Sequence, residues 1–186
     1  MSFFVTSQGL GRGGNLGGLA GADLYCKALA QEVGQGAKRW RAYLSTTGED
    51  GVNAKDRIGS GPWHNADGEL IAEDIDDLLN NRNKINSSTA LDEFGRRVNG
   101  IGHSINQHDI LTGTTKEGIA SDSRHDTTCK NWTSNGTGSA IVGHHDRRGG
   151  GRNPTSWSSA HNSRGCSQTN LSSSGGAGLY YCFVEN

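Results

Sequence analysis

The segment from Cys129 to Cys182 decides how the rest of this chain is interpreted. It opens with CKNWTSNGTGSAIVGHHDRRGGG (residues 129–151), continues through a serine-rich loop to Cys166, and closes with the apolar run LYYCFV (residues 179–184). It holds three of the four cysteines, two of the four tryptophans and three of the seven histidines. Because its backbone is rich in glycine, we interpret it as the loop-bearing half of a disulfide-stabilised recognition domain from an oxidising compartment.

Composition indicates one domain, spanning residues 1–186, with a small core. Only 32% of the residues are hydrophobic and 29 are glycine, and such a core gains from covalent crosslinks. The net charge of −1 gives no global attraction to nucleic acid or to a membrane surface. No apolar run approaches the roughly 20 residues that cross a bilayer, so membrane insertion is not expected. We expect a secreted or cell-surface protein, whose leader peptide is absent from this sequence.

The hydrophobic pattern predicts short strands and two helices between long loops. The clearest helix is expected over residues 22–33, where Cys26 falls on the apolar face and Gly34 ends the helix. The apolar residues with this helical spacing are Ala22, Tyr25, Cys26, Leu29 and Val33. A second helix is expected over residues 74–80, capped by Asp74. Strands are predicted at residues 3–7, 39–45, 70–72, 108–114, 129–134, 139–145 and 179–185.

Four cysteines allow three disulfide pairings. The order of elements resembles the C-type lectin-like fold. More closely, it is similar to the bacterial branch of that fold, found at the C-terminus of collagen-like surface adhesins and related distantly to endostatin. The stretches that carry the resemblance cover nearly the whole chain: residues 4–7, residues 15–23 with Cys26, and residues 70–72, 111–114, 129–134 and 181–183.

The resemblance implies an α+β fold of small mixed sheets with one or two helices and long glycine-rich loops. It also implies two nested disulfides, Cys26–Cys182 and Cys129–Cys166. Relatives of this kind bind glycans or extracellular proteins, and adhesin tips can form trimers. The chain has Asn153-Pro154-Thr155 where calcium-dependent sugar binders have Glu-Pro-Asn or Gln-Pro-Asp, and it lacks Trp-Asn-Asp. Calcium-bridged sugar binding of that type is therefore not expected.

The loop from Gly143 to Cys166 is the expected ligand-binding region. An aromatic ring beside small hydrogen-bonding groups suits a sugar or a peptide, and basic side chains suit a sulfated glycan. The candidate ligand-binding residues are Trp157, Ser158, His161, Asn162, Arg147, Arg148 and Arg152. The alternatives are that Trp157 is a buried anchor of the loop and that the arginines are solvated surface charges.

Histidines near the strand ends suggest a transition-metal site, which needs three or four ligands. His144 and His145 are adjacent on a strand, so they face opposite sides and only one can serve a given site. The candidate ligands are His103, His108, His145 (or His144 in its place), Asp146 and His161, for zinc or copper. The alternative is a set of surface histidines bonded to loop backbone. A separate calcium site is a further alternative in the loop 48–68, which carries the oxygen ligands Glu49, Asp50, Asn53 and Asp56.

Two other functional classes stay open. One is a metal-dependent enzyme that uses the loop histidines as acid–base groups, although neither G-x-S-x-G nor H-E-x-x-H occurs and no catalytic residue is assigned. The other is an oligomerising structural tip. The residues favour a binding module over both.

Overall fold

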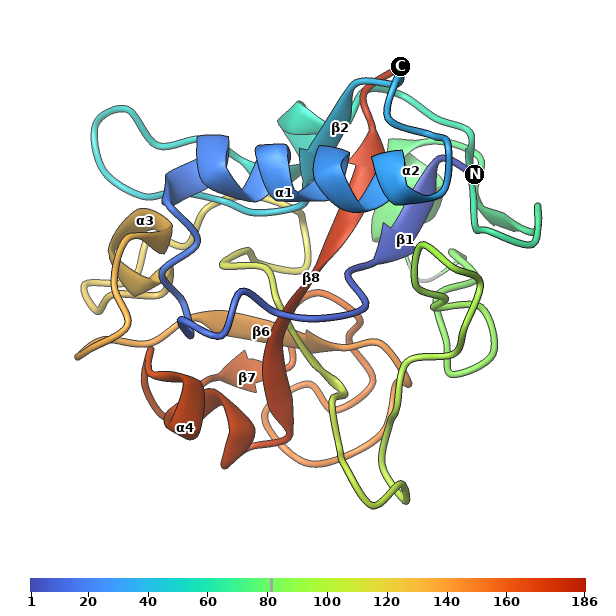
Figure 1. Cartoon of the computed structure of the whole chain (residues 1–186). Helices are drawn as coiled ribbons and strands as arrows, with labels where there is room; N and C mark the ends of the chain where they lie inside the picture. The colour runs from blue at the N-terminus through green and yellow to red at the C-terminus, as the bar shows by residue number, and fades with distance from the viewer. Residues whose placement is uncertain (81) are drawn as a thin grey trace.

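The last strand is the axis of the fold. The computed structural model describes residues 1–80 and 82–186, and in it β8 (Gly176–Val184) runs through the middle of the molecule (Figure 1). The N-terminal strand β1 (Phe3–Val5) pairs antiparallel with β8 and places Phe4 opposite Cys182. On the other edge of β8, β2 (Trp40–Ala42) pairs antiparallel and places Ala42 opposite the same cysteine. The two ends of the chain therefore lie in one sheet.

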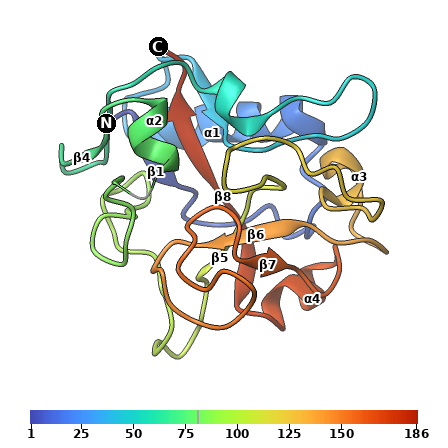
Figure 2. The ribbon, with the colours of Figure 1, turned by 180° about the vertical axis from the view of Figure 1, so that it is seen from behind.

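The other half of β8 carries a second group of strands. β5 (Asp109–Leu111) pairs parallel with β8, and β6 (Ile141–His144) pairs antiparallel with β5. The two-residue strand β7 (His161–Asn162) pairs with β6 and ends the order β1-β8-β5-β6-β7. Seen from behind, β5, β6 and β7 lie together with the loops of residues 145–160, away from α1 (Figure 2).

The long helix α1 (Gly18–Glu32) lies across the sheet beside β1, β2 and the end of β8 (Figure 1). The helix predicted over residues 22–33 is confirmed, but it begins four residues earlier, at Gly18. Gly17 and Gly18 both have positive φ, which lets the chain turn directly into the helix after Leu16. Cys26 is fully buried and Gly34 has φ of 74°, as the sequence predicted.

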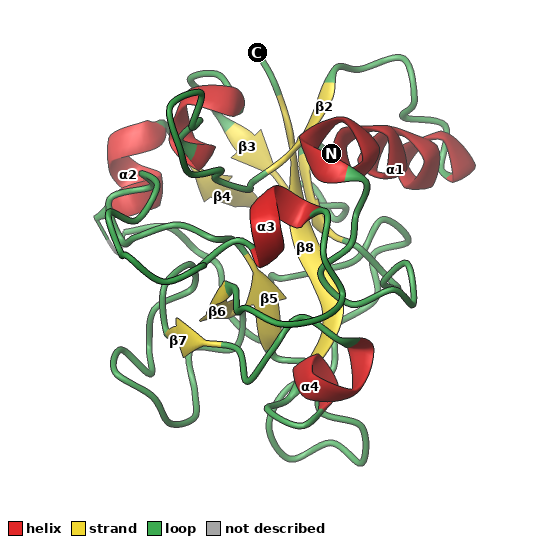
Figure 3. Cartoon of the chain, turned by 90° about the vertical axis from the view of Figure 1, so that its left-hand side faces the viewer, coloured by secondary structure: helices red, strands yellow, loops and turns green. Residues whose placement is uncertain are grey.

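The remaining elements are short and lie among loops, which form much of the surface (Figure 3). The predicted helix after Asp74 is α2, and the Asp74 carboxylate accepts a hydrogen bond from the Asp77 amide at 2.7 Å. The short elements are η1 (Ala54–Arg57), β3 (Trp63–His64), β4 (Leu70–Ala72), α2 (Ile75–Leu79), α3 (Cys129–Trp132) and α4 (Gln168–Ser172). The described residues thus form a mixed α/β fold of small sheets and four α-helices.

Both disulfides implied by the resemblance are present. Cys26–Cys182 joins α1 to β8 with a Cα–Cα distance of 5.7 Å, and Cys129–Cys166 closes the loop region with 5.6 Å. Disulfides of this kind are typical of extracellular proteins. In the part of the chain that the structure describes, no helix combines the length and apolar character needed to cross a membrane.

An aromatic cluster fills the core on the face of the sheet opposite α1, because Tyr180 and Cys182 of β8 contact α1 and the alternate residues Tyr181 and Phe183 point the other way. Phe183 packs against Phe3 and Trp63, with ring centroids 4.9 and 5.4 Å away. Trp157 reaches into this cluster from the long loop and packs 4.9 Å from Tyr43 and 5.2 Å from Tyr181. Only 2% of the Trp157 surface is exposed, so Trp157 is a buried anchor of the loop. This is the alternative given above, and the prediction that Trp157 contacts a ligand is wrong.

The strand predicted over residues 129–134 is wrong. The segment is instead the short turn α3, in which residues 129–132 have φ between 48° and 66°. Left-handed backbone costs roughly 1–2 kcal/mol for each non-glycine residue, so distant contacts must hold it. The Asn131 side chain accepts a hydrogen bond from the Thr47 amide at 2.9 Å, and Trp132 Nε1 donates to the Ser45 carbonyl at 2.8 Å. Trp132 is buried, as expected.

Candidate metal centre

Three neighbouring strands present Asp109, His144 and His161 on one face of the sheet. Asp109 on β5 lies directly opposite His144 on β6, and directly opposed residues of an antiparallel pair share a face. His161 on β7 lies opposite Val142, which is two residues from His144 and therefore on the same face. His108 immediately precedes β5 and joins them at the point where the strand begins.

The Nε2 atoms of three histidines converge on one oxygen of Asp109. Asp109 Oδ1 lies 3.2 Å from His108 Nε2, 3.3 Å from His144 Nε2 and 3.4 Å from His161 Nε2. The rings of His108 and His144 stack with their centroids 4.2 Å apart, and His161 meets the edge of His144 at 5.0 Å. Ligand atoms about 2.0–2.2 Å from a tetrahedral zinc ion are separated by about 3.3 Å, so these spacings suit such an ion.

The other nitrogen of each ring faces an oxygen. His108 Nδ1 lies 3.3 Å from Asp146 Oδ1, His144 Nδ1 lies 2.8 Å from the Pro154 carbonyl, and His161 Nδ1 lies 3.0 Å from the Asn162 carbonyl. A carbonyl only accepts, so Nδ1 of His144 and of His161 carries a proton, and in the neutral imidazole Nε2 is the nitrogen that can bind a metal. Histidines that bind metals are oriented by such outer hydrogen bonds.

Within the described residues, the centre contains buried polar atoms that have no hydrogen-bond partner. They are both carboxylate oxygens of Asp109 and Nε2 of His144. The contacts to Asp109 Oδ1 are within ion-pair range, but none of them has hydrogen-bond geometry. An unsatisfied buried polar group costs about 1–3 kcal/mol, and a buried charge costs more, so a cation placed between these atoms would remove that cost.

Electrostatics also favour a cation at this position. Burial alone raises the pKa of Asp109, but the facing nitrogens of His144 and His161 together with nearby imidazole charge lower this pKa to about 2. Burial likewise raises the pKa of Asp146, whereas the hydrogen bonds from His108 and from two backbone amides lower it well below the usual value. The Asp109 contact raises the pKa of His161. Both carboxylates are therefore ionised at neutral pH.

Glycines cover the imidazole rings closely. A Cβ atom added at Gly149 would lie 2.8 Å from His108 Cε1, and one at Gly151 would lie 2.8 Å from His161 Cδ2. One at Gly175 would lie 3.0 Å from His108 Nε2, beside the point where the ligand atoms meet. Since all three glycines have positive φ, both backbone conformation and space require them.

Five residues were predicted as metal ligands, and the structure brings two of them, His108 and His161, to the centre. Asp146 does not reach the centre, and its carboxylate contacts His108 Nδ1, the nitrogen that faces away from Asp109. His145 points to the opposite face, where its Nε2 contacts the Asn99 carbonyl at 3.2 Å and burial lowers its pKa. His103 is exposed on a turn and contacts the Gly100 carbonyl at 3.1 Å.

Two residues of the centre were missing from the predicted set. His144, the alternative to His145, occupies the inward position, and the other missing residue is Asp109, which lies opposite His144. A signal was available for Asp109, because it is a carboxylate between a histidine and the apolar pair Ile110-Leu111 at the start of a buried strand. In the described part of the chain, Glu49, Asp50 and Asp56 do not gather into a metal-binding group.

The predicted ligand-binding residues separate into buried and exposed sets. Ser158 is buried with Trp157, and its carbonyl accepts a hydrogen bond from Thr112 Oγ1 at 2.5 Å. The Arg147 guanidinium donates to the Ile85 carbonyl and to Asn83 Oδ1, both at 2.6 Å. These arginine contacts tie two loops together. Asn162, Arg148 and Arg152 are exposed, and His161 is partly exposed.

No protein-family model matches this sequence, and a search of the curated proteins finds no match either.

Proposed function

We propose that this protein is an extracellular binding module built around a divalent transition-metal ion, with zinc as the best fit. His108, Asp109, His144 and His161 hold the ion, and Asp146 orients His108. The observation that carries the proposal is the convergence of three Nε2 atoms within 3.4 Å of one buried carboxylate oxygen.

The ligand set selects the kind of metal. Imidazole nitrogen suits zinc, copper and other late transition metals, whereas calcium and magnesium take oxygen ligands almost exclusively. Three nitrogens and one carboxylate oxygen, with each nitrogen 3.2–3.4 Å from that oxygen, make a zinc-type set.

The fold supports the assignment to extracellular recognition. The terminal strands pair with each other, one disulfide ties the first helix to the last strand, and another braces the loops. These features agree with membership of the C-type lectin-like family, which uses its long loops for glycans and proteins. A polar cavity of about 630 Å³ adjoins the centre and is lined by His161, Asn162, Arg152 and several hydroxyl side chains. It supplies a place for such a ligand.

Zinc binding by the untagged protein tests the proposal. Isothermal titration calorimetry and elemental analysis are expected to give one zinc ion per chain. At a free zinc concentration 100-fold above Kd, the folded protein gains about 3 kcal/mol, which is measured as a rise in Tm.

Matched histidine variants locate the site. His144→Ala is expected to abolish zinc binding, whereas the exposed control His103→Ala leaves it unchanged. Asp146→Asn is expected to weaken binding by about 10- to 100-fold, as loss of an outer hydrogen bond to a ligand does. Circular dichroism establishes that each variant is folded. Zinc binding that survives in folded His144→Ala, or its absence from the wild-type protein, contradicts the proposal.

A further inference from the structure

The four residues of the candidate metal centre differ in exposure. The side chains of His108, Asp109 and His144 are 5%, 2% and 0% exposed, whereas that of His161 is 23% exposed. The three buried residues form a compact group with all ligand atoms within 4.8 Å of one another, and His161 is outside that group. His161 is also carried by the two-residue edge strand β7, which is the least supported strand of the sheet. His161 is therefore the residue whose bond to a metal ion would break at the lowest cost in free energy.

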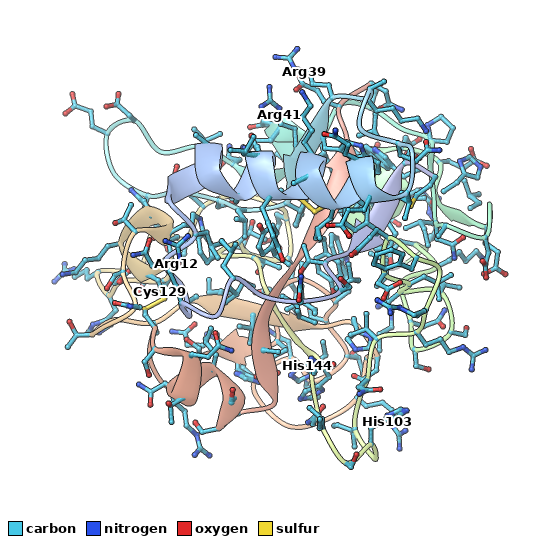
Figure 4. All side chains as sticks on the ribbon, in the orientation of Figure 1. Arg12, Arg39, Arg41, His103, Cys129 and His144 are labelled. Atoms are coloured by element: carbon cyan, nitrogen blue, oxygen red, sulfur yellow. A yellow bond between two sulfur atoms is a disulfide. The ribbon has the colours of Figure 1, made fainter. Side chains whose placement is uncertain are left out.

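A cavity opens on the same side of the centre. Its volume is about 380 Å³, and His108, His144 and His161 all line it. The lining includes the run Gly149–Gly151, which has no side chains to fill the space, and also Arg164, Ser173 and Ser174. Figure 4 shows the His144 side chain in the lower half of the molecule, away from α1. A group the size of a carboxylate or a small sugar acid fits this volume.

We infer that the His161 position of the metal is exchangeable and that it accepts an oxyanion, a carboxylate above all, from this cavity. The inference rests on the proposed metal centre. In the exchange, the bond from the metal to His161 Nε2 breaks and a bond from the metal to an anion oxygen forms, with no transfer of electrons. Three protein ligands with one remaining position is the arrangement by which metal sites bind outside ligands.

Charge favours an anion at this position. A divalent metal with the one coordinated carboxylate Asp109 carries one net positive charge, and the second carboxylate, Asp146, faces the far nitrogen of His108 and does not line the cavity. Among the residues that line the cavity there is no carboxylate, and Arg164 is exposed with no ion-pair partner in the described part of the chain. The hydroxyl groups of Ser173 and Ser174 already donate hydrogen bonds to the Asn170 and Leu171 carbonyls, so the guanidinium of Arg164 supplies the donors for a bound anion. The same carboxylate chemistry can come from a free metabolite or from a uronic acid within a glycan.

Cobalt substitution makes the coordination of the metal visible. The Co(II)-loaded protein is titrated at low ionic strength with acetate, phosphate, glucuronate and a glucuronate-containing oligosaccharide, while the visible d–d bands are recorded. We expect a saturable spectral change with acetate and glucuronate. Tighter binding of the oligosaccharide than of free glucuronate indicates a glycan source, and equal binding indicates a free carboxylate.

Two variant pairs test the roles of Arg164 and His161. Arg164→Gln is expected to weaken anion binding by about two- to fivefold, the range for an exposed charge pair, without changing metal affinity. The control Arg12→Gln alters an exposed arginine that lies away from His144 (Figure 4) and is expected to change neither. His161→Ala is expected to keep the metal, at reduced affinity, and to bind acetate more tightly, whereas folded His144→Ala loses the metal.

The outcomes separate this inference from the proposed function. Cobalt bands that no anion changes overturn the exchangeable position and leave the metal centre intact. Loss of the metal from folded His161→Ala, as complete as from His144→Ala, also overturns it, because His161 is then a fixed ligand. Absence of cobalt bands from the wild-type protein overturns the metal centre itself, and this inference with it.

Discussion

Two halves of this molecule bury side chains of opposite character. The aromatic half consists of α1, β1, β2 and residues 179–184, and its interior is apolar and closed by the Cys26–Cys182 disulfide. The histidine half consists of β5, β6, β7 and the loops 99–107 and 145–160, and it buries His108, Asp109, His144, His145 and Asp146. Apolar burial is favourable without a partner, whereas buried polar groups need one. The first half is therefore complete by itself, whereas the proposed cation would supply the partner that the buried polar groups of the second half lack.

Removal of a disulfide is the largest expected change, and it affects the aromatic half most. Replacing Cys26 and Cys182 by alanine is expected to lower the free energy of unfolding by about 5 kcal/mol, because the bond closes a very long loop. Replacing Cys129 and Cys166 is expected to cost about 4 kcal/mol, since that loop is shorter. Urea denaturation measures both values. A larger loss for the second pair contradicts this ranking.

Trp157 connects the two halves. Trp157→Ala is expected to lower the free energy of unfolding by about 3–5 kcal/mol, because the ring is packed between Tyr43 and Tyr181. The half-exposed Phe94 is the control, and Phe94→Ala is expected to cost much less. If Trp157 instead contacts a ligand from the surface, its replacement leaves stability unchanged and weakens ligand binding.

Among the arginines predicted to bind a ligand, the structure distinguishes the partly buried Arg147 from the exposed Arg152. Arg147→Ala is expected to cost about 2 kcal/mol, since its guanidinium holds the Ile85 carbonyl and Asn83. Arg152→Ala is expected to stay within about 0.5 kcal/mol, as exposed substitutions do. Thermal unfolding of both variants checks the difference. Equal effects indicate that the loop contacts of Arg147 add no stability.

The smallest expected effect is the pH dependence of metal binding. The pKa of Asp109 is lowered to about 2, so Asp109 stays ionised, while the raised pKa of His161 means that the metal must displace a proton from it. Zinc affinity is therefore expected to fall as the pH drops, by about tenfold or 1.4 kcal/mol per pH unit for each proton released. Competition titrations across roughly pH 7 to 5 measure the slope, which His161→Ala is expected to reduce.

In the metal-free protein, the contact between His161 and Asp109 makes the free energy of unfolding depend on pH in the opposite direction: the contact stabilises the fold at low pH. A raised pKa favours the protonated folded form, so its contribution to stability is complete below about pH 6.5 and is lost as the pH rises through the pKa of His161. Thermal unfolding of the chelated protein over this range tests the sign. A contribution that increases as the pH rises through this range contradicts the contact between His161 and Asp109.

The sequence by itself determined the features that depend on neighbours along the chain. The helical spacing of Ala22, Cys26 and Leu29 is sufficient to predict α1 and the inward direction of Cys26. The adjacency of His144 and His145 is sufficient to predict that they face opposite sides. A buried Trp132 also followed from the sequence.

Only the tertiary structure decided the features that depend on strand register and distant contacts. The pairing of β5 with β6 brings Asp109 opposite His144 rather than His145, and no local pattern contains that register. The left-handed turn at Cys129 needs Thr47 and Ser45, which are more than 80 residues away in the sequence. Local conformational preference is weak compared with such long-range packing. Local patterns were therefore sufficient to predict individual helices and strands, whereas only the tertiary fold brings together the residues of the candidate metal centre.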